Sequence, residues 1–308
     1  MLMRNSLSIT TLLAVLFAAT AQAKLNVVAT TADLGALARA IGGDHIRITS
    51  LGRPTEDVHF VDARPSFIRL LNQADVLIEG GAELEAGWLP PLLNSARNPK
   101  IQSTAPGHIL ALQGIRLLEV PTRPVDRAQG DVHATGNPHF LMDPANARIV
   151  AAHISDSFCQ IDPASCEAYR VNLKQFTEAL DARLVAWEKV LEPFKGQHAV
   201  SYHNSWPYFS ERFGIKVDVF LEPKPGIPPT PAHLAKVITQ MKEQKIRLIF
   251  VEPSLNRRTA ETVARATGAT LVDVSLFPGG IKGTEGDYLK LFDAITDALA
   301  RALSEPPK

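Results

Sequence analysis

The sequence has few cysteines and no long apolar segment. Only two cysteines, Cys159 and Cys166, occur among 308 residues, which excludes a disulfide-rich scaffold and a zinc site made from two cysteine pairs. The longest apolar run near the start, Leu12–Ala19, is far shorter than the ~20 residues that a membrane-spanning helix needs. We therefore expect no membrane span.

The chain also lacks an excess of charge of either sign. It has 32 basic and 32 acidic residues, which argues against a nucleic acid or an anionic membrane surface as partner. Hydrophobic residues make up 45% of the sequence, so a chain of this length can form two domain cores of ordinary size.

The first 23 residues have the pattern of a secretory signal peptide. Arg4 precedes the apolar run, and Ala21 and Ala23 form a small-residue cleavage signal, which predicts Lys24 as the mature N-terminus. No cysteine follows this point, so no lipid attachment is expected and a free periplasmic protein is predicted. An uncleaved membrane anchor is the alternative interpretation.

The two cysteines lie seven residues apart around a turn-like segment. In an oxidising compartment this spacing favours a disulfide that closes a short loop. Two unpaired buried thiols, or half of a zinc site, are the alternatives.

Apolar segments alternate with helical patterns along both halves of the chain, which predicts an α/β fold with parallel sheets covered by helices on both faces. Strands are expected at the following ranges: 25–31, 45–51, 74–80, 198–203, 216–221, 246–253 and 269–274. Helices are expected from residue 32 to 43 and around 85–93, and after the later strands up to Gly214 and from about Pro231, Arg257 and Asp287.

A long amphipathic helix is expected between the two halves. Its apolar positions advance by three or four residues over five turns, and they are Leu173, Phe176, Leu180, Leu184, Trp187 and Leu191. A helix of about 28 residues spans ~40 Å, enough to cross two lobes and limit their hinge motion. The predicted organisation is a signal peptide (1–23), an N-terminal metal-binding lobe (24–165), a linking helix (166–194) and a C-terminal metal-binding lobe (195–308). An ordinary surface helix of the second lobe is the alternative.

Two connections stand out by composition. Residues 121–137 contain two prolines, two glycines and almost no large apolar side chain, which indicates a mobile loop or lid. Residues 222–231 contain five prolines and are expected to form an ordered connection that leads into a helix.

Four potential metal ligands follow apolar runs in the loops that open helices. They are His59, His139, His203 and Asp273, each more than 60 residues from the next. The carboxyl ends of parallel strands would bring them into one crevice between the lobes. Neutral imidazoles suit zinc, and one carboxylate would complete a tetrahedron.

Other histidines do not lie after an apolar run in a loop that opens a helix. A single histidine is more often structural than a ligand, so the following are interpreted as structural: His45, His108, His153, His198 and His233. Glu222 and Glu252 are expected to orient a ligand or cap a helix, outside the direct ligand set.

Four motifs resemble those of the metal-binding solute-binding proteins of zinc and manganese ABC importers, over nearly all of the chain after residue 23. His59 is followed by Pro65 and Ser66, and the segment 137–146 is similar to NPHxWLDPxN. The third motif matches at His203, Tyr208, Phe209, Arg212 and Gly214, and the fourth at Phe250, Glu252, Pro253, Ala260, Glu261 and Asp273. Departures occur at Val58, Leu141, Asn204 and Val274, and none of them removes a predicted ligand atom.

The resemblance implies high-affinity capture of Zn²⁺ in the periplasm and delivery to an inner-membrane permease and its ATPase. The family's manganese members are similar but have a Glu where His203 stands, so zinc is predicted over manganese. The protein is expected to be a monomer, and a periplasmic metallochaperone that loads it stays an open question. Alternatives are a manganese- or iron-binding member, a zinc-dependent hydrolase with a water in the fourth position, and an adhesin-like surface protein.

The resemblance also raises a question about loop 121–137. Zinc-importer relatives often have a His-rich insertion before the second ligand, whereas this loop has a single histidine, His133. We hypothesise that His133 captures or shields the metal. An exposed histidine without a role is the alternative.

Overall fold

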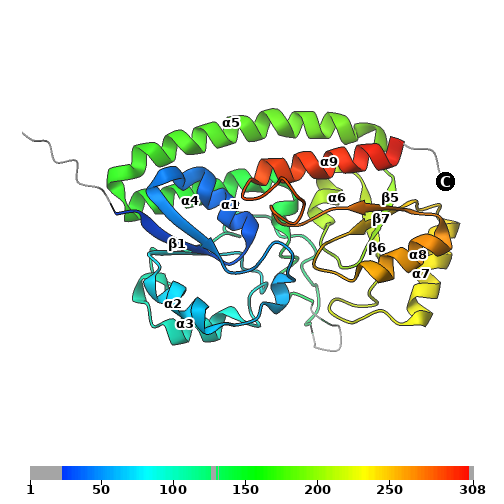
Figure 1. The fold of residues 1–308 in the computed structure, drawn as a ribbon, viewed down its shortest axis with the longest axis horizontal. Helices are drawn as coiled ribbons and strands as arrows, with labels where there is room; N and C mark the ends of the chain where they lie inside the picture. The colour runs from blue at the N-terminus through cyan, green and yellow to red at the C-terminus, as the bar shows by residue number, and fades with distance from the viewer. Residues whose placement is uncertain (1–22, 126–129, 131, 305–308) are drawn as a thin grey trace, which may run out of the picture.

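The computed structural model describes residues 23–125, 130 and 132–304, and within them the chain forms two lobes that each contain a parallel sheet (Figure 1). In the N-terminal lobe the strand order is β2-β1-β3-β4. All pairings in this sheet are parallel. The strands are β1 (Leu25–Ala29), β2 (Ile46–Ser50), β3 (Val76–Glu79) and β4 (His108–Leu110).

The C-terminal lobe repeats the same arrangement. Its strand order is β6-β5-β7-β8, again with parallel pairings throughout. The strands are β5 (His198–Ser201), β6 (Lys216–Phe220), β7 (Leu248–Val251) and β8 (Thr270–Asp273). In both sheets the first and third strands in chain order are neighbours. Their carboxyl ends therefore lie next to each other, at the end of the sheet where α/β folds bind ligands.

One face of each sheet is covered by a pair of helices that belongs to that lobe alone. In the first lobe α2 (Pro65–Gln73) and α3 (Leu89–Ala96) bury Phe67, Leu71, Leu89 and Leu92 against it. In the second lobe the covering helices are α7 (Pro231–Glu243) and α8 (Arg257–Thr267). Figure 1 shows these two pairs below the sheets.

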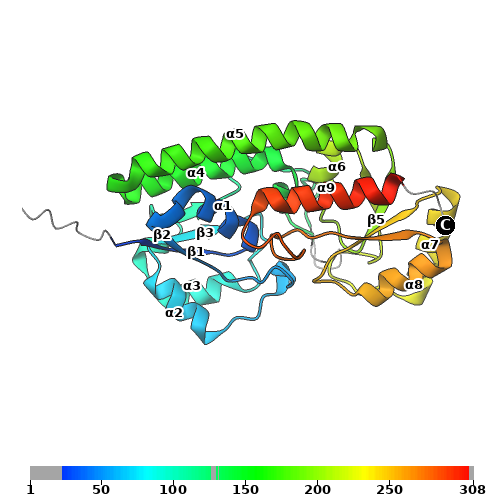
Figure 2. The ribbon, with the colours of Figure 1, turned by 45° about the horizontal axis from the view of Figure 1, so that its top comes forward.

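The other faces share one apolar core that runs through both lobes. The helices that line it are α1 (Ala32–Gly42), α4 (Pro144–Ile161), α5 (Cys166–Leu191), α6 (Pro207–Phe213) and α9 (Tyr288–Ser304). Helix α5 contacts α1 and α4 on one side and α9 on the other, and both views show it extending across the two lobes (Figures 1 and 2). The two lobes are therefore held along one stiff common element.

Helix α5 confirms the predicted link between the lobes. Its 26 residues correspond to ~39 Å at 1.5 Å per residue. Phe176, Leu180, Trp187 and Leu191 are buried as their spacing predicts, and the indole of Trp187 donates a hydrogen bond of 2.9 Å to Asp293 on α9. Tyr169 adds a fully buried position that the predicted stripe did not include.

Specific polar contacts made by the helices of this shared core also join the two lobes. The guanidinium of Arg212 on α6 donates two hydrogen bonds, of 2.8 and 2.9 Å, to the carboxylate of Asp143 at the start of α4. The hydroxyl of Tyr288 on α9 donates to the carbonyl of Leu141 over 2.6 Å. A bidentate ion pair and a buried hydrogen bond fix orientation more strictly than apolar contact does.

The observed elements follow the predicted alternation with small differences. Strand β4 was not predicted, because its three residues are too few to show a periodic pattern. Helix α3 begins at Leu89 rather than near Glu85 because Pro90 and Pro91 occupy its first turn, where proline is accepted.

Some of the predicted segments fall outside the described residues. The signal peptide does so except for Ala23, and so do residues 126–129 and 131 of the loop 121–137. Among residues 23–125, 130 and 132–304, no helix is both long and apolar enough to cross a membrane.

The predicted disulfide is present between Cys159 and Cys166, whose Cα atoms lie 4.4 Å apart. It closes the loop between the last turn of α4 and the first residue of α5. The bond thus joins the two helices at the end of α5 that lies over the N-terminal lobe (Figure 2).

We expect replacement of both cysteines by serine to lower the free energy of unfolding by about 2 kcal/mol, because the open loop has more freedom in the unfolded chain. Urea unfolding with and without a reducing agent measures this. The reducing agent should destabilise the wild type and leave the double variant unchanged. An equal response of the two proteins would contradict the expected contribution.

Candidate metal centre

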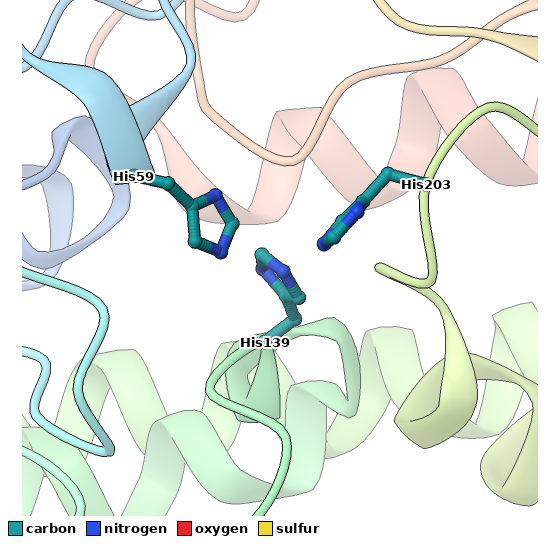
Figure 3. A group of neighbouring side chains, drawn as sticks. All are labelled: His59, His139 and His203. Carbon is teal, nitrogen blue, oxygen red and sulfur yellow. The ribbon is translucent and has the colours of Figure 1, made fainter. Parts of the chain in front are cut away.

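Three of the four predicted ligands meet between the lobes. His59, His139 and His203 each offer a ring nitrogen, and these three atoms lie within 4.8 Å of one another. Figure 3 shows the three rings turned toward a common point from three separate segments. We call these residues the histidine cluster. Ring nitrogens at this mutual distance can bind one metal ion together, since zinc–nitrogen bonds are ~2.0 to 2.1 Å long.

His59 is held by a short 3-10 turn, Val58–Phe60. Asp57 precedes this turn, and its carboxylate accepts hydrogen bonds from the backbone N–H of His59 at 3.0 Å and from the ring Nδ1 at 2.9 Å. The indole of Trp88 donates to the carbonyl of Val58 over 2.9 Å and fixes the turn to the lobe. Nδ1 is therefore occupied, and Nε2 is buried without a hydrogen-bond partner among the described residues.

His139 is the most enclosed member of the cluster, with 7% of its surface exposed. Its backbone N–H donates to the side-chain oxygen of Asn137 over 3.0 Å, and the amide of Asn137 in turn donates to the carbonyl of Asn204 across the cleft at 2.9 Å. The ring Nε2 of His139 is buried and has no hydrogen-bond partner among the described atoms. A buried imidazole nitrogen without a partner is costly unless it binds something.

His203 follows β5 in a tight bend. The hydroxyl of Ser201 and the N–H of Ser205 both donate to its carbonyl, at 2.6 and 2.9 Å. Its ring Nδ1 lies 2.5 Å from a carboxylate oxygen of Glu222, which is itself buried just after β6. This pairing directs Nε2 into the cleft. Carboxylates that hold Nδ1 in this way are the usual partners of metal-binding histidines, because they fix the ring and raise its basicity.

The three rings differ in their proton affinity. Burial lowers the pKa of His139 well below its ordinary value, and the neighbouring His59 and His203 lower this pKa further. Burial also acts against the charged form of His203, but the hydrogen bond and charge of Glu222 outweigh it and raise the pKa of His203. The cluster therefore holds at least one neutral imidazole, the form that binds metals, at neutral pH.

The surroundings of the cluster combine acidic and apolar side chains. Glu252 lines the same pocket and is almost fully buried, with its carboxylate accepting a hydrogen bond of 2.8 Å from the indole of Trp206. Burial raises the pKa of Glu252 to about 7. Leu276 and Phe277 form an apolar wall of this pocket. A cation there would be close to negative charge yet shielded from water on one side.

The structure does not bring Asp273, the fourth predicted ligand, into the histidine cluster. Its side chain is 68% exposed and forms an ion pair with Arg257 at the start of α8. Asp273 ends β8, the edge strand, and the chain needs a few more residues to reach the pocket, where Leu276 and Phe277 line it. The position of Asp273 at the end of a strand was predicted from the sequence, whereas the direction of its side chain was not.

Sequence reasoning also missed Asp57, whose carboxylate orients His59. The signal was present as an Asp two residues before a histidine, a spacing at which an aspartate caps a turn and reaches the next ring. Glu222 was expected to orient a ligand or cap a helix, and its contact with His203 agrees with the first of these roles. Asn204 has a different contact, since its side-chain amide donates to Glu119 over 2.8 Å.

Comparison with known proteins agrees with this fold. The family described as the periplasmic component A of zinc-uptake complexes matches residues 27–302. The chain belongs to this family of solute-binding proteins of ABC metal transporters. The resemblance drawn from the four motifs is therefore confirmed, and so is the predicted periplasmic location.

Relatives of this chain differ in the metal that their names give. The manganese ABC transporter substrate-binding lipoprotein PsaA of Streptococcus anginosus is 26% identical, with 93% of this chain and 92% of that protein covered. The iron-binding protein YfeA of Yersinia pestis is 27% identical, with 92% and 87% covered.

Solved structures confirm the predicted fold. A crystal structure of ZnuA superposes with a TM-score of 0.76 at 22% identity and covers 91% of this chain and 100% of that one. A manganese-bound periplasmic metal-binding protein from Candidatus Liberibacter asiaticus gives a TM-score of 0.72 at 23% identity, with 91% and 99% covered. At this level of identity the likeness concerns the fold alone.

Family membership decides the general function. The protein is a periplasmic metal-binding component of an ABC importer and works with a membrane permease and an ATPase. It is a binding protein and not an enzyme, which removes the zinc-dependent hydrolase among the alternatives.

We expect Glu222→Gln to weaken metal binding about tenfold to hundredfold, because the neutral amide no longer holds and polarises the His203 ring. Competition with a chromophoric chelator at about pH 7.5, where most imidazoles are neutral, measures the affinity. Asp218→Asn is the matched control, since Asp218 also accepts a hydrogen bond from a histidine, His198, but away from the cluster. Equal loss in both variants would show that Glu222 has no particular role in the site.

Proposed function

We propose that this protein captures Zn²⁺ in the periplasm through His59, His139 and His203 and delivers it to its importer. The observation that carries the proposal is the convergence of three imidazole nitrogens within 4.8 Å in a buried pocket between the lobes. Three nitrogen ligands are typical of zinc sites, whereas manganese favours carboxylate and carbonyl oxygens.

The state of the neighbouring carboxylates supports zinc over manganese. Asp57 and Glu222 each accept a hydrogen bond from the Nδ1 of a histidine, and Glu252 accepts one from Trp206. These oxygens are engaged in orienting or supporting the site and are not part of the group of atoms that converge. The donor set that remains is nitrogen-rich, which suits a borderline-soft ion.

Manganese or iron is the second candidate. It is favoured by relatives named for these metals, PsaA and YfeA, which are 26% and 27% identical to this chain. The ligand type outweighs this likeness in our proposal, because selectivity follows the donor atoms of the site more directly than overall identity does. A monomeric state and loading by a metallochaperone stay predictions.

We expect the wild type to retain zinc in preference to manganese and iron after exposure to an equimolar mixture of these three metals, with the protein limiting and after extensive washing. His203→Glu should shift the retained metal toward manganese, because a carboxylate replaces one nitrogen. Elemental analysis of the purified proteins measures the content. His198→Gln, which changes a histidine on β5 outside the pocket, is the control and should match the wild type. Wild type that retains manganese in preference to zinc would contradict the proposed selectivity.

A separate variant tests the predicted role of Asp273. To act as a ligand, this carboxylate would have to leave Arg257 and move into the pocket. We expect Asp273→Asn to change zinc affinity less than about threefold, well below the roughly tenfold to hundredfold that follows the loss of a supporting residue. Competition titration measures the change. A loss of about tenfold or more would show that Asp273 reaches the metal after all.

A further inference from the structure

A fourth histidine lies beside the histidine cluster, on the loop that precedes His139. The ring centroid of His133 is 5.3 Å from that of His59. This equals the distance between the centroids of His59 and His139, and it is close to the 5.2 Å between those of His59 and His203. His133 therefore approaches His59 as closely as the two proposed ligands do.

The free ring nitrogen of His133 has no partner among the described residues. Its Nε2 is buried and makes no hydrogen bond. The backbone of Ala82 accepts a hydrogen bond from the ring, and Nδ1 is the atom left to donate it. This contact fixes the tautomer in which Nε2 has its lone pair available, the form that binds a metal.

The backbone around this contact has an unusual conformation. Ala82 and Glu83 both have positive φ angles, of 52° and 65°, which few residues other than glycine adopt. The backbone of Ala82 accepts the hydrogen bond from the ring of His133, and the carboxylate of Glu83 accepts one of 2.5 Å from the N–H of Ala134. Backbone strain of this kind is found where the surrounding structure has to hold a functional group in place.

The same loop touches the other lobe. Gly130 has a φ of 85°, and a Cβ atom at this position would collide with the carbonyl oxygen of Pro225. The side chains of His133, Asn137, His203 and Asn204 line one pocket with Pro225. Described residues of the loop thus contact the N-terminal lobe on one side of the cluster and the C-terminal lobe on the other.

We propose that Nε2 of His133 supplies the fourth ligand of the metal held by His59, His139 and His203, so that the loop completes a site of four imidazoles. The inference rests on the proposed function, since it needs the metal to bind at the histidine cluster. His133 is not among the three residues whose ring nitrogens all lie within 4.8 Å. A small movement of the His133 side chain toward the ion would complete a tetrahedral arrangement, the usual geometry of zinc with four protein ligands.

The test compares zinc affinity and the visible spectrum of the Co²⁺-loaded protein among variants. His133→Ala should bind zinc at least about tenfold more weakly than the wild type and show a shifted Co²⁺ band, because one nitrogen ligand is replaced by water. Thr135→Ala, an exposed change on the same loop, is the matched control and should behave as the wild type. Unchanged affinity and an unchanged Co²⁺ band in His133→Ala would overturn the proposal.

Two further variants separate the possible failures. His133→Cys places a thiolate at the same position, and coordination there produces an intense sulfur-to-cobalt charge-transfer band that no residue of the wild type gives, because both native cysteines are in the disulfide. The absence of that band in folded, Co²⁺-loaded protein would count against the inference.

His139→Ala should abolish binding whether or not His133 is a ligand. If it binds metal as the wild type does, the proposed function itself fails.

Discussion

The site depends on the burial of one helix against both lobes. Helix α5 places apolar side chains on a core that includes residues of each lobe, and α9 lies alongside it. Because this core is shared, the two sheets have a defined relative position, and residues of both lobes line one pocket between them. The ion pair of Arg212 with Asp143 adds an orientation that apolar packing alone would not set. Three histidines from distant parts of the chain can then converge without any local motif.

The histidine cluster is organised by what lies behind each ring. Asp57 and Glu222 occupy the Nδ1 atoms of His59 and His203, and the backbone of His139 is fixed by Asn137. Each ring nitrogen that remains is directed at the same small volume. Negative charge from these carboxylates also balances part of the charge of an entering dication, which neutral imidazoles cannot do. The acidic partners therefore contribute to binding alongside the ligands themselves.

Most of the fold could be predicted because its strands are short apolar runs that alternate with helical patterns, and because the apolar positions of α5 recur every three or four residues over five turns. The three histidines could be singled out because His203 follows a strand within two residues, and His59 and His139 each lie in a loop that leads into a helix. Asp273 also ends a strand, but the side-chain direction at that end depends on a bend in the next residues, and sequence periodicity does not show it. The three residues of β4 are too few to show a periodic pattern. The contact of His133 with Ala82 involves a residue with a positive φ angle, a conformation that the residue type alanine does not predict.

The stiffness of α5 has a consequence for how the cargo leaves. In binding proteins whose lobes are joined by flexible strands, a wide swing of one lobe can expose the ligand to the transporter. A continuous helix of 26 residues embedded in a core common to both lobes resists such a swing. The importer would then gain access by displacing short surface segments, such as the turn around His59 and the bend at His203, and the ion would exit as these individual contacts are withdrawn one after another.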